Sequence, residues 1–338
     1  MGVRCPVGLT APQTAAAIRA GISRIGEHPY LTDASRAKVL CGVDASLDPV
    51  LQGPARFAGL AGPALLQVDA ILSAAQAASP RVPLLLALPE TRPGFETTDL
   101  GTMQKLFGTI SLTSIDPAPV SISGTGHAGG LAALRDGIDR IARGQDRICV
   151  VGGVDTYLHF GTIRWLDEGR RLAREGTRAG FPPGEAAAFV AIAGEEELRR
   201  HQLRPLARVS GVACMRESQP FDADEGLQGK VLAEVIEAAA SGLSAEQEIS
   251  DTYGDINGER PRTEDWGFAL MRTTRRFRDG TAYVTPVGSC GDVGAASGVL
   301  GCVLAVEAWR RGYAHGSRAL VWAGSWNGLR GAALLERV

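Results

Sequence analysis

The sequence predicts an α/β protein built from two similar halves. Its 338 residues include 43 glycines, 45% hydrophobic residues and only 6% aromatic residues, a composition that fits helices packed closely against sheets. One series of elements occurs twice: a strand, a glycine-rich turn, a helix of small residues and an apolar strand. We expect residues 1–200 and 201–338 to form the two halves.

The first series lies in the N-terminal half. Residues 120–124 (VSISG) have the pattern of a short strand, and residues 124–130 (GTGHAGG) form the turn. The helix that follows ends in Arg143 and Gly144, a basic last turn before a glycine. The apolar run at 147–154 (RICVVGGV) then predicts a strand buried on both faces.

The second series repeats this order in the C-terminal half. Its turn is 291–294 (GDVG), its helix ends in Arg311 and Gly312, and its last strand is 318–324 (RALVWAG). The small residues after both turns allow close approach to other backbone, so we expect both helices to be buried between sheets. The positive end of the first helix dipole would then lie beside His127.

Composition excludes several classes of function. The formal net charge is −2 and charged residues make up 21%, so no attraction to nucleic acid or to an anionic membrane is expected. We see no signal peptide and no run of about 18 apolar residues, and we therefore expect a cytoplasmic protein. The six cysteines form no C-x-x-C pair and no H-E-x-x-H spacing occurs, so neither a metal nor a cofactor is expected.

Three segments together resemble one family. They are GTGHAGGLAALRDGIDRIARGQDRICVVGGVD (124–155), AGFPPGEAAAFVAIA (179–193) and SCGDVGAASGVLGCVLAVEAW (289–309). Their order and spacing resemble the thiolase-like superfamily, and β-ketoacyl synthases most of all. The resemblance implies a duplicated α-β-α-β-α five-layered fold and a homodimer with the strand at 147–154 near its interface. It also implies that Glu185 is structural.

The resemblance also places three candidate catalytic residues. His127 stands where the family has its nucleophilic cysteine, and Asp255 (in GDINGE) and Asp292 (in CGDVGAASG) stand where it has two histidines. Carboxylates would repel a developing enolate rather than stabilise it, and an acyl-imidazole would hydrolyse readily. We therefore expect a protein that does not condense acyl thioesters.

Two classes of function stay open. The first is an accessory or scaffold protein, because DINGERPRTEDWGF (255–268) resembles a subgroup of thiolase-like proteins associated with the loading of type VI secretion effectors. The stretch from Asp255 to Trp266 would then bind a secretion effector or adaptor protein, or be a solvated loop. The second is an acyltransferase or thioester hydrolase acting on acyl-CoA or an acyl carrier protein, with a carboxylate orienting His127 as general base.

Three further hypotheses attach to single residues. Cys290 could be a relocated nucleophile, although its position in the family pattern is a packed one. GTGHAG has the form of a dinucleotide-binding turn, for which Asp155 would be the acidic residue after the next strand. His159 is expected at the surface or at an interface.

Overall fold

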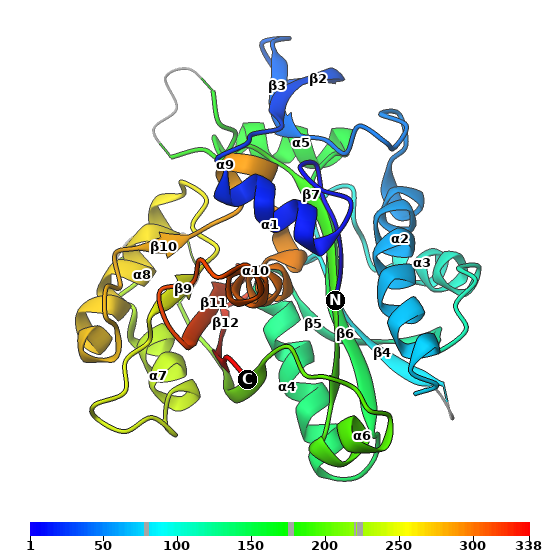
Figure 1. The fold of residues 1–338 in the computed structure, drawn as a ribbon. Helices are drawn as coiled ribbons and strands as arrows, with labels where there is room; N and C mark the ends of the chain where they lie inside the picture. The colour runs from blue at the N-terminus through cyan, green and yellow to red at the C-terminus, as the bar shows by residue number, and fades with distance from the viewer. Residues whose placement is uncertain (78–80, 175–178, 220, 222–225) are drawn as a thin grey trace.

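The structure is a computed structural model that describes residues 1–77, 81–174, 179–219, 221 and 226–338. Within these ranges it contains two five-stranded sheets and one two-stranded hairpin. The hairpin consists of β2 (Ile25–Thr32) and β3 (Lys38–Gly42), and it projects from the top of the molecule in Figure 1.

The first sheet has the strand order β1-β7-β6-β4-β5. Its strands are β1 (Gly2–Arg4), β4 (Val82–Leu88), β5 (Ile115–Thr125), β6 (Ile148–Thr156) and β7 (Glu185–Ala193). Strand β4 pairs in parallel with β5 and β6, whereas β7 runs antiparallel to β6 and β1.

Strand β6 lies inside this sheet, and every one of its residues is buried, as the apolar run predicts. It pairs with β4 on one side and with β7 on the other. Its backbone therefore offers no edge to a second chain, which argues against the expectation that this strand lies near a subunit interface. In the described part of the sheet, β5 and β1 are the edge strands.

The second sheet has the order β10-β9-β11-β12-β8. Its strands are β8 (Arg208–Arg216), β9 (Asp251–Tyr253), β10 (Tyr283–Val284), β11 (Arg318–Gly324) and β12 (Leu329–Glu336). All of them come from residues after 200, and those of the first sheet come from residues before 200. The division of the chain into halves at this point stays a prediction.

Helices complete a five-layered arrangement, which confirms the predicted fold class. Between the sheets lie α4 (Gly129–Ala142) and α10 (Ser297–Arg311); outside the first sheet lie α2 (Gly53–Ala74) and α3 (Asp99–Gly108); outside the second lie α7 (Lys230–Ala239) and α8 (Arg260–Thr273). The remaining helices are α1 (Ala11–Arg19), α5 (Phe160–Glu168), α6 (Glu195–Arg200), α9 (Val287–Cys290), η1 (Thr274–Arg276) and η2 (Gly294–Ala296). The central helices share one hydrophobic core with both sheets (Figure 1).

The two central helices touch through their glycines. A Cβ atom on Gly130 of α4 would lie 2.9 Å from Cγ2 of Val299, and one on Gly298 of α10 would lie 2.9 Å from Cγ of Leu131. Such distances are too short for a real Cβ contact. The small residues after both turns are therefore required by the close crossing of α4 and α10, as the sequence predicts.

Helix α2 corrects one expectation from the sequence. By length and composition it could cross a membrane, although we expected no such segment. Half of its apolar window is buried, and Phe57, Leu60 and Leu65 belong to the core on the outer face of the first sheet. Arg56 near its start is fully buried and bonds the Glu185 carboxylate at 2.6 Å. A position in the protein core thus accounts for its apolar composition.

We predict that Gly130→Ala lowers the free energy of unfolding by about 1–3 kcal/mol, because an added methyl group overpacks the crossing of α4 and α10. Gly101 in α3 is the matched control, since a Cβ there would meet nothing within 4 Å. Gly101→Ala should raise stability by up to about 1 kcal/mol. Urea unfolding of both variants measures the difference, and equal effects would contradict the close crossing.

Candidate functional site

The turn that carries His127 connects β5 to α4. Gly126 has φ +70°, and a Cβ there would lie 2.7 Å from both Oε2 of Glu90 and Oγ of Ser325, so only glycine fits. The Ser325 hydroxyl accepts a hydrogen bond from the backbone N–H of Ala128 at 3.0 Å. The turn is thus held by residues of both halves, and it leaves His127 only 3% exposed.

Asp292 enters the same site from the loop between α9 and η2. Its backbone N–H donates to the carbonyl of Pro182 at 2.8 Å. Its Oδ1 accepts from the backbone N–H of Gly294 at 2.8 Å, which caps the helical segment that leads into α10. The carboxylate is 1% exposed, so the loop fixes it in the interior.

Asp255 follows β9 and lies next to the end of β11. Its Oδ2 accepts from the backbone N–H of Gly324 at 2.9 Å and from Nη1 of Arg262 at 2.5 Å. The same guanidinium nitrogen donates to the carbonyl of Gly324 at 2.6 Å. Arg262 lies in the first turn of α8 and is 1% exposed.

His127 lies between Asp292 and Arg262, and both of its ring nitrogens are engaged. Nε2 is 2.8 Å and 3.0 Å from the two carboxylate oxygens of Asp292, and Nδ1 is 3.1 Å from Nη2 of Arg262. A carboxylate only accepts and a guanidinium only donates. We therefore assign the neutral tautomer in which Nε2 carries the proton and Nδ1 accepts from Arg262.

Further polar side chains extend this buried network. The amide nitrogen of Asn257 donates to Oδ2 of Asp292 at 2.6 Å and to Oε2 of Glu259 at 3.0 Å. Glu259 also accepts from Nε of Arg171 at 2.6 Å and lies 3.4 Å from Nε of Arg262. The candidate site is thus a buried network of paired charges rather than an open catalytic centre, although Oδ1 of Asp255 is buried without a described partner.

The charges in this network hold each other in their ionised forms. Burial works to raise the pKa of the Asp292 carboxyl, but the hydrogen bond from His127, the charge of Arg262 and the hydrogen bond from Gly294 keep that pKa below its usual range. Burial would likewise lower the pKa of Arg262, yet the carboxylates of Asp255, Glu259 and Asp292 raise it. Both groups are therefore charged at neutral pH.

All three residues predicted from the sequence meet here. His127 contacts Asp292 directly and reaches Asp255 through Arg262. The sequence does not predict that Arg262 links His127 to Asp255. It predicts that the stretch from Asp255 to Trp266 is a protein-binding surface or a solvated loop. Both alternatives are wrong for most of this stretch. Its buried members are Asp255, Ile256, Asn257, Glu259, Arg262, Asp265 and Trp266.

A signal for this burial exists in the sequence. Pro261 stands in the first turn of α8, where proline is common. The buried positions Arg262, Asp265, Trp266 and Ala269 then follow the spacing i, i+3, i+4 and i+7 of one helix face. Because most residues of this stretch are charged or polar, the spacing of one buried helix face is not evident from an apolar pattern.

The other candidate residues have structural roles. Cys290 is fully buried beside Cys5, and the contact with Cys5 together with burial raises its pKa, which disfavours a nucleophilic thiolate. Asp155 is paired with Arg92 at 2.5 Å and is 1% exposed, so it cannot bind a ribose. His159 caps α5 by accepting from the N–H of Gly161 at 3.1 Å.

Glu185 accepts hydrogen bonds from Arg56, from the N–H of Asp44 and from the Thr156 hydroxyl. It is fully buried and has a structural role within this chain. Among the described residues, no group of three or more His, Cys, Asp or Glu side chains is placed to hold a metal ion.

A cavity of about 410 Å³ lies beside the His127 turn. Its lining residues are Glu90, Thr91, Arg92, Thr125, Tyr157, Trp165, Arg171, Trp326 and Asn327. His127 is not among them. The cavity therefore approaches the turn without opening onto the imidazole.

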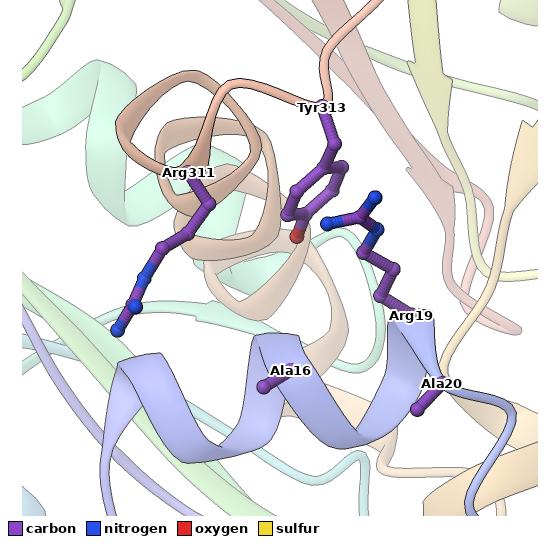
Figure 2. Close-up of a pocket in the computed structure, with 5 residues that line it drawn as sticks. All are labelled: Ala16, Arg19, Ala20, Arg311 and Tyr313. Carbon is purple, nitrogen blue, oxygen red and sulfur yellow. The ribbon is translucent and has the colours of Figure 1, made fainter.

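A second hollow of about 440 Å³ lies between α1 and the C-terminal end of α10, the end remote from Asp292 (Figure 2). Figure 2 shows the Arg19 guanidinium beside the Tyr313 ring, 4.2 Å from its centroid, with Arg311 on the other side of the ring. Both arginines stand near helix C-termini, where positive charge is favourable. This hollow has no connection to the candidate site.

Comparisons with known proteins give similarity in structure only. No family model matches the chain, and no curated protein matches it in sequence. The ketosynthase AntDE of a type II polyketide synthase, solved in complex with its acyl-carrier protein AntF, has a TM-score of 0.78 at 16% identity, covering 100% of this chain and 98% of that one.

Two other ketosynthases are similar over the whole of this chain. The OzmH KS7 domain of Streptomyces albus JA3453 has a TM-score of 0.71 at 16% identity, with 75% of its own chain covered. The module 6 ketosynthase of the Bacillus subtilis 168 bacillaene synthase has a TM-score of 0.70 at 15% identity, with 71% covered. The protein therefore has the thiolase-like fold of the ketosynthases, as the sequence predicts.

We predict that Arg262→Met lowers the free energy of unfolding by about 3–5 kcal/mol, because it leaves the buried Asp255 carboxylate without its cation. Arg260 on the same helix is the control, since its side chain is 79% exposed. Arg260→Met should change stability by no more than about 0.5 kcal/mol. Equal effects in urea unfolding would show that Arg262 does not support the site.

We also predict that Asp292→Asn destabilises the protein in a pH-dependent manner. Because the folded-state pKa of Asp292 is lowered, its ionised form contributes stability above the unfolded pKa of about 4, and this stability is lost as pH falls through the folded pKa. The difference in unfolding free energy between wild type and variant should be largest at pH 7 and should shrink below about pH 4.

Urea unfolding between pH 7 and pH 3 measures this difference. Asp48→Asn is the control, because the exposed Asp48 side chain accepts a described hydrogen bond only from the N–H of Val50 in its own turn. A difference between wild type and Asp292→Asn that stays constant with pH would contradict an ionised Asp292 in the folded state.

Proposed function

We propose that this protein is a non-condensing protein of the ketosynthase fold that acts by binding rather than by acyl transfer. The observation that carries the proposal is the state of His127. Both of its nitrogens are hydrogen-bonded, one to Asp292 and one to Arg262, and the ring is buried. No lone pair and no open surface are left for an acyl thioester.

The surrounding charges argue in the same direction. Condensation develops negative charge on an enolate oxygen, which needs hydrogen-bond donors directed at it. Asp292 instead presents an ionised carboxylate, and the side-chain oxygens of Asp255 are acceptors rather than donors. The donors of Arg262 are already bound to Asp255, Gly324 and His127.

The alternative of a thioester hydrolase or acyltransferase finds less support in this geometry. A general base needs a nitrogen lone pair within reach of water or substrate. Nε2 of His127 carries the proton that it donates to Asp292, and the lone pair of Nδ1 accepts from Arg262. The Asp292–His127 pair thus resembles part of a catalytic triad whose reactive side is occupied by a guanidinium.

Binding partners follow from the sequence and from one comparison. An acyl carrier protein suits the proposal, because the similar ketosynthase AntDE is in complex with one. A secretion effector or adaptor, formation of a homodimer and a cytoplasmic location stay predictions from the sequence. An accessory or scaffold role would use this fold as a surface for such partners.

We predict that the purified protein forms no β-ketoacyl product from acyl-CoA and malonyl carrier protein, and that intact-mass analysis finds no lasting acyl adduct. A known ketosynthase assayed in parallel is the positive control. His127→Cys should not restore condensation, because Asp255 and Asp292 still oppose an enolate. Wild-type turnover of about 1 per second or faster would overturn the proposal.

A further inference from the structure

The cavity beside the His127 turn carries an excess of hydrogen-bond donors. Nε of Arg92 and Nε1 of Trp326 are buried without a partner in the described part of the chain. The only described side-chain hydrogen bond of Arg171 runs from Nε to Glu259, so both of its terminal nitrogens lack a described partner. The Arg171 side chain is partly exposed and lines the cavity. Its terminal N–H groups are therefore the donors that a ligand in the cavity can reach.

Several acceptors in the lining already bond within the protein. The two Glu90 oxygens accept from the backbone N–H groups of Trp326 and Asn327, at 3.1 Å and 2.5 Å. The hydroxyl oxygen of Thr125 accepts from the Asn327 amide at 2.8 Å, and the Asn327 carbonyl oxygen accepts from the N–H of Leu329 at 3.1 Å. A ligand that brings only donors would thus share these acceptors with bonds that the protein already makes.

The lining is also aromatic. The Arg171 guanidinium lies 4.0 Å from the ring centroid of Trp326 and 5.0 Å from that of Trp165. The Arg92 guanidinium lies 4.2 Å from the ring centroid of Tyr157. Flat rings and guanidinium planes favour a planar partner over a flexible chain.

The charges of the side chains around the cavity favour a ligand without net charge. Arg92 is paired with Asp155 at 2.5 Å, and Arg171 is paired with Glu259 at 2.6 Å. Glu90 adds a carboxylate to the lining itself. Both guanidiniums are therefore neutralised from within the protein, and their remaining N–H groups suit a carbonyl oxygen.

We propose that this cavity binds a neutral, planar aromatic compound that carries a carbonyl group. The ring packs against Trp165, and the carbonyl oxygen accepts from the terminal nitrogens of Arg171. Binding at this site is independent of any chemistry at His127, which does not line the cavity. The cavity volume of about 410 Å³ lies within the range of ordinary small-molecule sites.

Two probes of the same shape test the proposal: 2-acetylnaphthalene, which has the carbonyl acceptor, and 2-isopropenylnaphthalene, which lacks it. Isothermal titration calorimetry should show about tenfold tighter binding of 2-acetylnaphthalene, since only this probe pairs the free donors. Equal affinities, or tighter binding of the hydrocarbon, would overturn the proposal.

Nuclear magnetic resonance of protein with ¹⁵N-labelled tryptophan locates the site. On addition of 2-acetylnaphthalene, the indole N–H signals of Trp165 and Trp326 should shift. The signal of Trp309 is the internal control and should not move, because its Nε1 donates to Gly316 remote from the cavity. Binding without shifts at Trp165 and Trp326 would also overturn the proposal.

Two variants separate stacking from hydrogen bonding. Arg171→Met should bring the affinities for the two probes close to equality, because it removes the donor to the carbonyl group. Trp165→Leu should lower the affinity for both probes by the same factor, so that the tenfold preference for 2-acetylnaphthalene remains. Arg164→Met, at an exposed position of α5 outside the lining, should change neither. Circular dichroism confirms the fold of each variant. An unchanged preference in folded Arg171→Met contradicts the proposed carbonyl contact.

Discussion

The arrangement of the protein interior depends on one buried guanidinium. Arg262 links α8 to the loop after β9, to the end of β11 and to the turn before α4, through Asp255, Gly324 and His127. A buried cation is strongly unfavourable unless its donors are paired. The three loops must therefore present acceptors in fixed positions, and Arg262 acts as the common partner that fixes their distances.

Hydrogen-bond geometry, rather than the charge count, sets the tautomer of His127. The carboxylates around the site are Asp155, Asp255, Glu259 and Asp292, and the guanidiniums are Arg92, Arg171 and Arg262. A protonated imidazole would add a cation and balance the count. It would also direct an N–H of Nδ1 at the donors of Arg262, 3.1 Å away. Local geometry therefore outweighs the charge balance, and the imidazole keeps a lone pair on Nδ1 that Arg262 occupies.

Much of the fold could be predicted from the sequence, because its signals are local. The two glycine-rich turns, the small residues after them and the apolar run of β6 each follow from short-range spacing. The packing of α4 against α10 through Gly130 and Gly298 is the physical reason for those small residues. The contact between His127 and Asp292 is predicted by the family resemblance and not by short-range spacing in the sequence.

The network around these two residues could not be predicted in the same way. Charged side chains are rarely buried, so the run from Asp255 to Trp266 was assigned to a surface or loop. Its burial depends on partners distant in sequence: Arg262 bonds His127 across 135 positions, and Arg171 bonds Glu259 across 88. The cavity residues are equally scattered, from Glu90 to Asn327. Such pairings become visible only once the layers are assembled.

The same network gives the centre of this protein and the cavity beside it different characters. The fold brings two helix N-termini and three loops to one point. In this protein the point itself is closed, because His127, Asp292 and Arg262 satisfy one another. The partly exposed terminal nitrogens of Arg171, which have no described partner, lie instead at the neighbouring cavity. In this structure the donors that are free to meet a ligand are therefore beside the centre of the fold and not at it.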